Sequence, residues 1–186
     1  GTHSGVFHAD DVTSVMLLTN FLPEYRNAEI IRTRDMSVLQ NLDLICDVGG
    51  EYDHARCRYD HHQQGFEETF SKQHDIKLSA SGLIFKHYGE QLVRNTLSHL
   101  FEVEPSMHSY KMELSDEDAS KMKNKLYDDF FMCLDAVDNG INQYPSGVEP
   151  RYRGNNTSMI DRIGRLNPRW WIDNPKPQDE LFKDAM

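Results

Sequence analysis

The segment Asp43-Leu44-Ile45-Cys46-Asp47-Val48-Gly49-Gly50 decides which fold this sequence predicts. The apolar run within it has the length of a β-strand, and the paired glycines mark its end. Because polar residues do not alternate along the run, it is typical of a strand buried on both faces, as in a parallel sheet. Asp47 stands out, since a carboxylate in an otherwise apolar strand is costly without hydrogen bonds or a cation.

Helix-like and strand-like segments alternate on either side of this run. The β-branched residues within 28–33 predict a strand, and a short stretch before Asp60 is a further candidate. Apolar residues at helical spacing, with capping residues or breakers at the ends, predict helices. These helices begin near Asp10, Met36, Ser79 or Ser81, Ser115 and Thr157, with Pro23 ending the first and Gly140 ending the one from Ser115. The alternation predicts one domain built on an α/β layered sheet.

The composition is that of an ordinary globular domain, with 38% hydrophobic and 27% charged residues in a chain of 186. No apolar stretch approaches the length of a membrane span, and no signal-peptide pattern opens the chain. Cys46, Cys57 and Cys133 are odd in number and scattered, which favours a reducing, intracellular compartment over a disulfide framework. Because the chain begins one residue before a candidate ligand loop, we expect a trimmed fragment.

The net charge of −10 argues against broad, non-specific attraction to nucleic acid. Residues 151–171 differ from the rest, because they contain five arginines and a single acid, Asp161. We interpret the adjacent Trp170 and Trp171 as a packing anchor, with a base-stacking platform as the alternative. A basic or aromatic path leading from a catalytic site would favour a polymeric substrate, whereas a closed, Lys-rich pocket would favour a small anion.

Asp60-His61-His62 is the strongest chemical signal, although a solvated turn can also contain such a triplet. Imidazole nitrogens and carboxylate oxygens are donors that divalent Mn, Fe, Co and Zn accept. The same chemistry recurs in other segments, at His3, His8, Asp10, Asp47, Asp135 and Asp138. Ligands of open α/β sheets gather outside the carboxyl ends of the strands, and several of these positions follow a predicted strand or begin a predicted helix. We therefore predict a metal site on one rim of the sheet.

Simpler explanations exist for single positions. His3 can be a mobile terminal side chain, and Asp10 can cap the first helix, although Asp11 can do that instead. Asp138 lies at a helix C-terminus, where the macrodipole disfavours negative charge, so a compensating group is expected. Asp135 shares its face and is interpreted as a residue behind the ligands. The other histidines are interpreted as surface or helix-face residues: His54, His74, His87, His99 and His108.

Longer motifs extend this pattern over nearly the full chain. They are Thr-His-x-Gly-x-Phe-His-x-Asp at 2–10, Arg-Thr-Arg-Asp at 32–35, Asp-Val-Gly-Gly-Glu-Tyr-Asp at 47–53, Arg-Tyr-Asp-His-His-Gln at 58–63, Leu-Ser-x-Ser-Gly-Leu-Ile at 78–84, Asp-Ala-Val-Asp-Asn-Gly-Ile at 135–141 and Gly-Arg-Leu-Asn-Pro at 164–168. With them the sequence resembles the DHH phosphoesterase superfamily and, within it, the exonuclease family of melanocyte proliferating gene one. The resemblance implies a single DHH-like domain over residues 1–186, with a three-layer, doubly wound, mainly parallel sheet and helices on both faces. It also implies that relatives continue into a C-terminal lobe that is absent here.

The resemblance further implies a centre of two divalent ions. His3 and His8 would hold one ion and Asp10 the other. Asp47 would bridge both ions, and His61 and Asp138 would complete the second. His62 would face the phosphate, and Asp60 would orient His61 from behind. The mixed donors favour Mn²⁺, with Mg²⁺ as the alternative. Ala9 and Asp11 depart from residues that relatives often carry, and neither is an expected ligand.

The implied activity is that of a 3′-5′ exoribonuclease, which releases nucleoside 5′-monophosphates from single-stranded RNA in mitochondria and the nucleus. His62, Asp60 and Asp135 would support catalysis around the ions. Candidates to bind phosphates of the substrate are Arg32, Arg34, Arg151 and Arg153. Two alternatives stay open: a pyrophosphatase or small nucleotide phosphatase with the same centre, and a metal-binding RNA or protein scaffold without turnover. The sequence does not indicate an oligomeric state.

Overall fold

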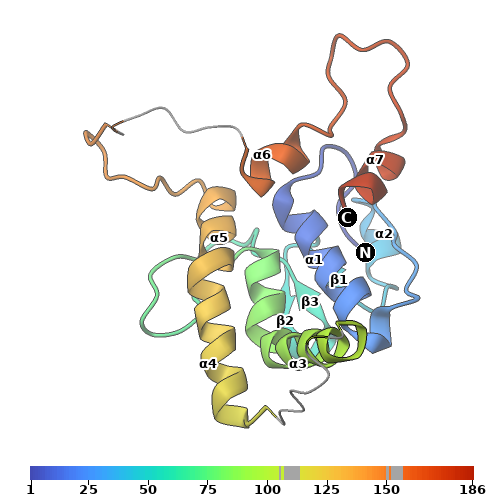
Figure 1. The fold of residues 1–186 in the computed structure, drawn as a ribbon. Coiled ribbons are helices and arrows are strands. Elements are labelled where there is room, and N and C mark those ends of the chain that lie inside the picture. The colour runs from blue at the N-terminus through green and yellow to red at the C-terminus, as the bar shows by residue number, and fades with distance from the viewer. Residues whose placement is uncertain (105, 107–113, 150, 152–156) are drawn as a thin grey trace.

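The computed structural model describes residues 1–104, 106, 114–149, 151 and 157–186. Its named strands are β1 (Ile45–Cys46), β2 (Tyr52–Asp53) and β3 (Arg58–Tyr59), in the order β1-β3-β2 (Figure 1). β1 runs parallel to β3, with Ile45 opposite Arg58, and β2 runs antiparallel to β3, with Tyr52 opposite Tyr59. The sheet is therefore small, open and mixed.

The first residues of the chain extend the sheet beyond β1. Thr2 forms a parallel bridge with Arg32, and the backbone N–H of Cys46 donates to the carbonyl of Gly1 at 3.0 Å. Residues 1–2 thus lie between β1 and residues 31–33. Of the strand predicted over 28–33, the structure contains a single β-bridge at Arg32.

β1 is shorter than the predicted strand over 43–48, although both of its residues are buried as the apolar run predicted. The backbone leaves the extended conformation at Asp47, which has a φ of 56°, and Gly49 follows with a φ of 104°. Positive φ is uncommon outside glycine, but a short polar side chain such as that of Asp tolerates it. Beyond this turn, the Asp47 carboxylate lies 3.3 Å from His3 Nε2 and 3.8 Å from His61 Nδ1.

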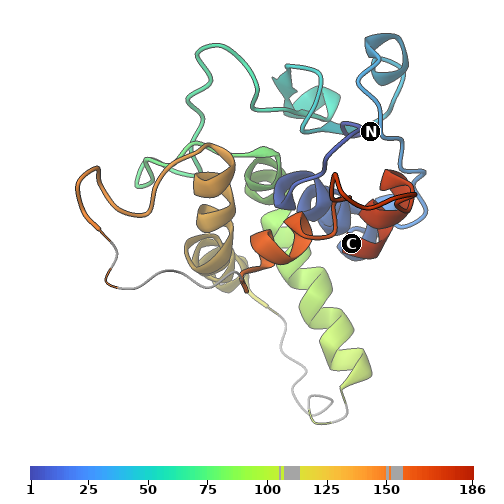
Figure 2. The ribbon, with the colours of Figure 1, turned by 90° about the horizontal axis from the view of Figure 1, so that it is seen from above.

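Helices α1 (Ala9–Phe21) and α3 (Ala80–Val103) pack against each other and against the sheet. The His8 backbone N–H donates to the Asp11 carboxylate at 2.7 Å and caps α1, and Ser79 is the N-cap of α3. Seen from above, the strands lie along one side of the molecule and these helices lie at its centre (Figure 2). The core between them consists largely of Phe7, Val12, Leu18, Tyr59, Leu78, Leu83 and Ile84.

The helix predicted from Ser115 to Gly140 is confirmed as one helical run with a local irregularity. It comprises α4 (Asp116–Leu126), a π-helical segment η4 (Tyr127–Phe131) and α5 (Met132–Asp138). The Ser115 hydroxyl accepts a hydrogen bond from the backbone N–H of Asp118 at 3.1 Å, and Gly140 takes a φ of 67° just beyond the end. Such π-helical turns occur often at functional sites. This one places the Tyr127 ring against Phe70, with centroids 3.8 Å apart.

The remaining helices are short. α2 (Met36–Leu39) confirms the predicted turn at that position, η1 (Pro23–Tyr25) follows α1, and η2 (His54–Arg56) joins β2 to β3. α6 (Met159–Gly164) is capped by Ser158 rather than by the predicted Thr157, because the Ser158 hydroxyl accepts from the N–H of Asp161. α7 (Gln178–Ala185) was not predicted. None of the helices in the described residues has the length and apolar character needed to cross a membrane.

The mixture of helices with a small mixed sheet agrees with the predicted α/β class. The finer prediction, a three-layer doubly wound sheet, stays a prediction. The arrangement matters for function because the ends of β1, β3 and α5 and the start of α1 approach one another, and these ends carry the predicted ligands.

Candidate metal centre

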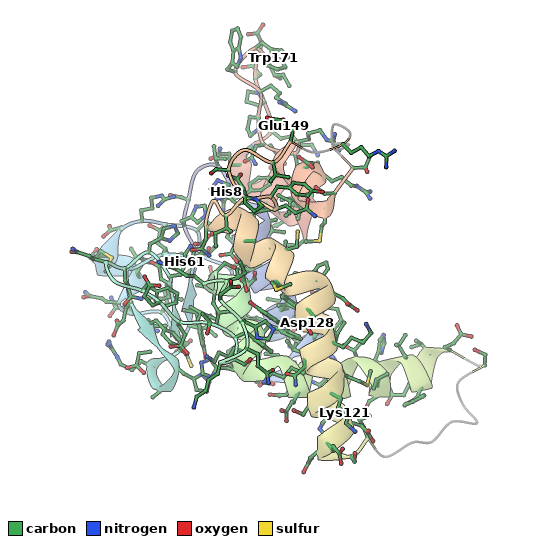
Figure 3. All side chains as sticks on the ribbon, turned by 90° about the vertical axis from the view of Figure 1, so that its left-hand side faces the viewer. His8, His61, Lys121, Asp128, Glu149 and Trp171 are labelled. Atoms are coloured by element: carbon green, nitrogen blue, oxygen red, sulfur yellow. The ribbon has the colours of Figure 1, made fainter. Side chains whose placement is uncertain are left out.

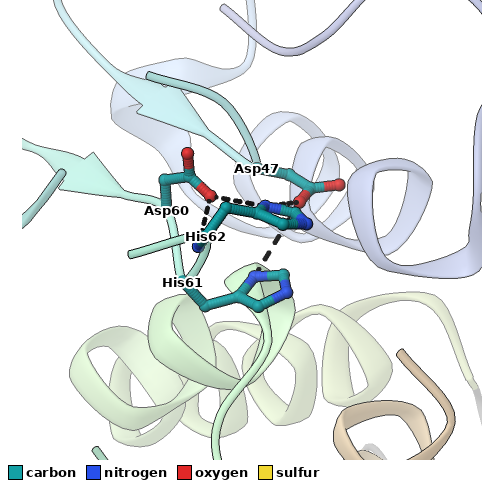
Figure 4. A group of neighbouring side chains, drawn as sticks. All are labelled: Asp47, Asp60, His61 and His62. Atoms are coloured by element: carbon teal, nitrogen blue, oxygen red, sulfur yellow. Dashed lines mark hydrogen bonds and ion pairs between the residues drawn. The ribbon is translucent and has the colours of Figure 1, made fainter. Parts of the chain in front are cut away.

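All six predicted ligands converge in the folded chain. They come from the N-terminal segment (His3), the start of α1 (His8 and Asp10), the ends of β1 and β3 (Asp47 and His61) and the last residue of α5 (Asp138). Four of them have at most 8% of their surface exposed: His3, Asp10, Asp47 and His61. Figure 4 shows Asp47 beside Asp60, His61 and His62, and Figure 3 labels His8 and His61 in the same region of the molecule.

The ligand atoms form two groups of three. One group is His3, His8 and Asp47, and the other is Asp10, His61 and Asp138; within each group the donor atoms lie within 4.8 Å of one another. Asp47 Oδ1 also lies 3.8 Å from His61 Nδ1, so this carboxylate stands between the groups. A further overlapping group contains Asp47, Asp60, His61 and His62. The two groups contain the six residues that the family resemblance implied as ligands, and their assignment as ligands stays a prediction.

Buried polar atoms without partners show that the site fits cations. Asp47 Oδ1 and His61 Nδ1 are buried and have no hydrogen-bond partner, and neither has Asp11 Oδ2. Leaving a buried donor or acceptor unpaired costs about 1–3 kcal/mol, and more for a charged group. A divalent ion beside the carboxylate and the imidazole would satisfy both atoms, because both are donors that divalent metal ions accept.

The charges of the cluster point to the same conclusion. Burial, and then repulsion from Asp10 and Asp138, raise the pKa of Asp47 well above its ordinary value. Burial also raises the pKa of Asp10, with a further contribution from Asp138. Burial lowers the pKa of His61, but its hydrogen bond with Asp138 and the surrounding carboxylates outweigh this and raise it to about 9. Divalent ions would offset this buried negative charge, and their binding would be coupled to the release of protons.

Asp10 is both a candidate ligand and the cap of a distant helix. Its carboxylate accepts hydrogen bonds from the Ser79 hydroxyl at 2.5 Å, the Ala80 N–H at 2.9 Å and the Ser81 N–H at 2.7 Å. These donors are the start of α3, which carries the positive end of the helix dipole. A carboxylate offers about four lone-pair sites, so one remains for an ion. Asp11, not Asp10, caps α1, as the sequence left open.

Asp135 lies behind the ligands, as the sequence predicted for its position, and belongs to none of the ligand groups. Its Oδ1 accepts from the Ser79 N–H at 2.9 Å and contacts the Ser79 hydroxyl at 2.8 Å, while the Tyr127 hydroxyl donates to its Oδ2 at 2.8 Å. Burial raises the pKa of Asp135 to about 7. Through Ser79, Asp135 supports the position of Asp10.

Asp60 contacts His62 rather than His61, which corrects the predicted role. His62 Nδ1 lies 2.8 Å from Asp60 Oδ1, and the Gly50 N–H donates to the other carboxylate oxygen at 2.6 Å. The hydrogen bond with Asp60 raises the pKa of His62, whose side chain is 63% exposed. His62 therefore presents its ring to the open side of the centre, and Asp138, at 3.0 Å, is the residue that orients His61.

The predicted phosphate-binding arginines have different settings. Arg34 is exposed and lines a hollow of about 360 Å³ at the centre, together with His3, His8, Asp47 and His62. Arg32 differs from the prediction: its side chain is only 2% exposed, donates to the Gly5 carbonyl at 2.7 Å and pairs with Asp179 at 3.0 Å. It holds α7 to the ligand loop and is not free to bind substrate. Arg151 is exposed and does not line this hollow, and Arg153 lies outside the described residues.

The structure also shows the surroundings of Trp170 and Trp171 and of the histidines outside the centre. Trp170 is 91% exposed and Trp171 61% exposed, so neither anchors the packing in the described chain. The rings of His54 and His87 stack with centroids 3.7 Å apart, His74 contacts Asp128, and His99 is exposed on α3. His108 lies outside the described residues.

Two contributors to the centre were not predicted from the sequence. Asp11 Oδ2 lies 3.2 Å from His3 Nε2, so the residue that caps α1 also orients a candidate ligand. Ser79 joins Asp10 to Asp135, although the sequence indicated only a helix cap. The acidic pair at the start of α1 was the one available signal for Asp11, whereas the role of Ser79 depends on residues far away in the sequence.

The fold and the site together define an α/β domain with a candidate centre for divalent metal ions. The family model described as Uncharacterised protein family (UPF0160), the MYG1 exonuclease family, matches residues 1–186. The chain belongs to this family.

Relatives with this name occur in distant eukaryotes. The chain is 41% identical over 189 residues to a MYG1 protein of Dictyostelium discoideum, which covers 100% of the chain and 51% of the relative. It is 43% identical over 194 residues to the MYG1 exonuclease of Homo sapiens, covering 100% of the chain and 46% of the relative. The chain thus spans about half the length of the curated relatives it matches. No solved structure matches it.

Proposed function

We propose that the protein is a metal-dependent phosphodiesterase that acts as a 3′-5′ exoribonuclease and releases nucleoside 5′-monophosphates from single-stranded RNA. The observation that carries this proposal is the convergence of two groups of three His and Asp ligands, with Asp47 between them. Relatives named MYG1 exonuclease support a nuclease as the class of enzyme.

The ligand groups suit a two-metal reaction. A pair of divalent ions supplies a water of lowered pKa and positive charge beside the phosphate oxygens in such centres. His3, His8 and Asp47 would hold one ion, and Asp10, His61 and Asp138 the other; the mixed donor set favours Mn²⁺ over Mg²⁺. The hydrogen bonds that Asp10 accepts from α3 keep its free lone pair directed at the centre.

Residues on the open side of the centre would position the substrate. Asp60 holds the exposed His62 ring, and the raised pKa of His62 favours the form that donates a hydrogen bond to a phosphate oxygen. Arg34 lines the same hollow and would bind a neighbouring phosphate. Further away, the exposed Arg162, Arg165, Arg169, Trp170 and Trp171 would contact the RNA strand, where stacking on an aromatic ring contributes about 1–3 kcal/mol per base.

The decisive experiment measures cleavage of RNA that is labelled at its 5′ end. Protein treated with a chelator is inactive, and added Mn²⁺ yields products that shorten one nucleotide at a time from the 3′ end. Asp47→Ala and His61→Ala each abolish this activity because each removes a ligand from the centre. His99→Ala, at an exposed histidine of α3 outside the centre, is the matched control and keeps the parent rate. Cleavage by either ligand variant at the parent rate contradicts the assignment.

A pyrophosphatase with the same centre is the first alternative. Among the residues that line the hollow at His3 and His62, Arg34 is the one Lys or Arg side chain, so the hollow is not the Lys-rich pocket expected for a small polyanion. Comparing phosphate release from pyrophosphate with nucleotide release from RNA separates the two activities. A scaffold without turnover is the second alternative. It predicts that Mn²⁺ raises the melting temperature while no substrate is cleaved.

Membership of the DHH phosphoesterase superfamily, the doubly wound sheet and residence in mitochondria and the nucleus belong to the same proposal. Their support is the set of motifs from residue 2 to residue 168, above all Asp60-His61-His62. Imaging a fluorescently tagged full-length protein in cells tests the location, independently of the activity.

A further inference from the structure

A second hollow adjoins the metal centre on the side of α6. It has a volume of about 390 Å³ and lies between the loop before α1, α5 and α6. His8 and Asp138 line this hollow and also the hollow that contains His62 and Arg34. The two spaces therefore meet at candidate ligands of both ions, and Figure 3 shows His8 close to α6. One molecule would therefore be able to place a phosphate at the centre and a covalently attached group in the second hollow.

The walls of this hollow are apolar. They consist mainly of Val6, Phe7, Leu134, Val137 and Ile160. Val6 and Val137 are 55% and 50% exposed, so the walls remain open at the rim. Among the described residues that line it there is no Lys or Arg, although a site for a second phosphate would need a cation. The volume lies in the range of small-ligand pockets, about 300–1,000 Å³, and apolar walls are typical of such pockets.

The polar groups of the hollow are already engaged. The Asn167 side-chain oxygen accepts from the Phe7 N–H at 3.0 Å, and its NH₂ group donates to the Phe7 carbonyl at 2.7 Å. His8, Asp10 and Asp138 are candidate metal ligands. The apolar walls can therefore hold a flat ligand by contact, while the Asn167 amide, the one side-chain amide among the described lining residues, is held in place by Phe7. Hydrogen bonds to base edges are what distinguish one base from another.

We propose that this hollow binds the base of the nucleotide whose phosphate lies at the metal centre, and that it does so without distinguishing between bases. The proposal rests on the proposed function for the phosphate and adds the position of the nucleoside. It also separates nucleotide substrates from inorganic pyrophosphate, which has no group to fill an apolar space.

The test compares ligands that differ only in the base. Binding of adenosine 5′-monophosphate and of ribose 5-phosphate to the Mn²⁺-loaded protein is measured by isothermal titration calorimetry. Adenosine 5′-monophosphate binds about 10-fold more tightly, as expected when a base gains contact with the exposed apolar side chains of Val6 and Val137. Inosine 5′-monophosphate, whose purine has a different hydrogen-bonding edge, binds within a few-fold of the adenosine compound.

Variants locate this preference in the hollow. Val6→Asn, in the loop before α1, and Val137→Asn, in α5, each place a neutral polar group in the hollow, and both abolish most of the preference for adenosine 5′-monophosphate while ribose 5-phosphate binds as before. Val148→Asn is the matched control, because Val148 is 53% exposed and does not line the hollow. It keeps the preference. Titration of Mn²⁺ alone into each variant checks that the metal centre is intact.

The outcomes separate this inference from the proposed function. Equal binding of the two phosphates to the parent protein overturns the inference, as does a preference that survives both wall variants. A strong preference for adenosine 5′-monophosphate over inosine 5′-monophosphate overturns the claim that the hollow does not distinguish between bases. If RNA is not cleaved but the preference depends on Val6 and Val137, the hollow still binds a base and the exoribonuclease proposal alone fails. If RNA is cleaved without such a preference, the inference alone fails.

Discussion

The buried Asp135 allows a sharp test of how the region behind the metal centre is stabilised. Its residue is 0% exposed, and it is held by the Ser79 N–H and the Tyr127 hydroxyl. Burial raises its pKa to about 7, against an ordinary value of 3.8. The folded protein therefore keeps this proton up to about pH 7, whereas the unfolded chain releases it near pH 4. Folding becomes less favourable as the pH rises through this window.

Asp135→Asn removes the ionisation while it preserves the size of the side chain. The difference between the folded-state pKa of about 7 and the ordinary value of 3.8, at about 1.4 kcal/mol for each pH unit, corresponds to about 4 kcal/mol in the free energy of unfolding. The free energy of unfolding of the Asn variant, relative to the parent protein, should therefore rise by about that amount between pH 4 and pH 8. A constant offset from the altered hydrogen bond to Tyr127 does not affect this slope.

The assay is urea denaturation of chelator-treated protein at pH values from 4 to 8, with the parent and the variant measured side by side. Other titrating groups are shared by the two proteins and largely cancel in the difference. Asp173→Asn, at an exposed carboxyl, controls for the loss of an acid as such. If the difference between Asp135→Asn and the parent stays constant over the whole range, the reasoning about the buried carboxyl is refuted.

Three further predictions concern residues around the centre. Gly82→Ala destabilises the protein by at least the 1–3 kcal/mol that is roughly typical of overpacking, because a Cβ at this position overlaps the Asp135 carboxylate. Gly89→Ala in the same helix meets only the flexible Lys123 side chain and is the control; thermal unfolding of both variants checks the contrast. Arg32→Met costs about 1–3 kcal/mol because the buried Arg32 side chain loses its hydrogen bond to the half-buried Gly5 carbonyl, whereas Asp179→Ala removes an exposed partner and costs less than about 1 kcal/mol. Equal decreases in the free energy of unfolding of Arg32→Met and Asp179→Ala, measured by urea denaturation, would contradict this. Burial, together with His54, lowers the pKa of His87 to about 4 from the ordinary 6.5. Between these pH values His87 is protonated in the unfolded chain and neutral in the folded protein. The free energy of unfolding of the parent protein should therefore fall by about 1 kcal/mol, after allowance for solvent screening, as the pH falls from 6.5 to 4. His87→Gln should lack this part of the pH dependence, and an unchanged pH profile would argue against it.

The sequence by itself determined the local features of this protein. The cap at Ser115 with Asp118, the stop at Gly140 and the buried strand at Ile45–Cys46 follow from residues a few positions apart. The side chains able to bind metal were also evident from the sequence, because imidazoles and carboxylates at the ends of strands and helices have few other reasons to recur. Short-range hydrogen bonds and apolar periodicity act before any distant contact forms.

Only the tertiary structure decided which partner each of these groups takes. Asp10 caps a helix that begins about 70 residues later, Asp60 bonds His62 instead of His61, and Arg32 is buried between the ligand loop and α7. The hollow beside His8 likewise exists only because α5 and α6 pack next to the start of α1. In each case several local partners were chemically equivalent, and the choice among them depended on which groups the packed core brought within hydrogen-bond distance while excluding water.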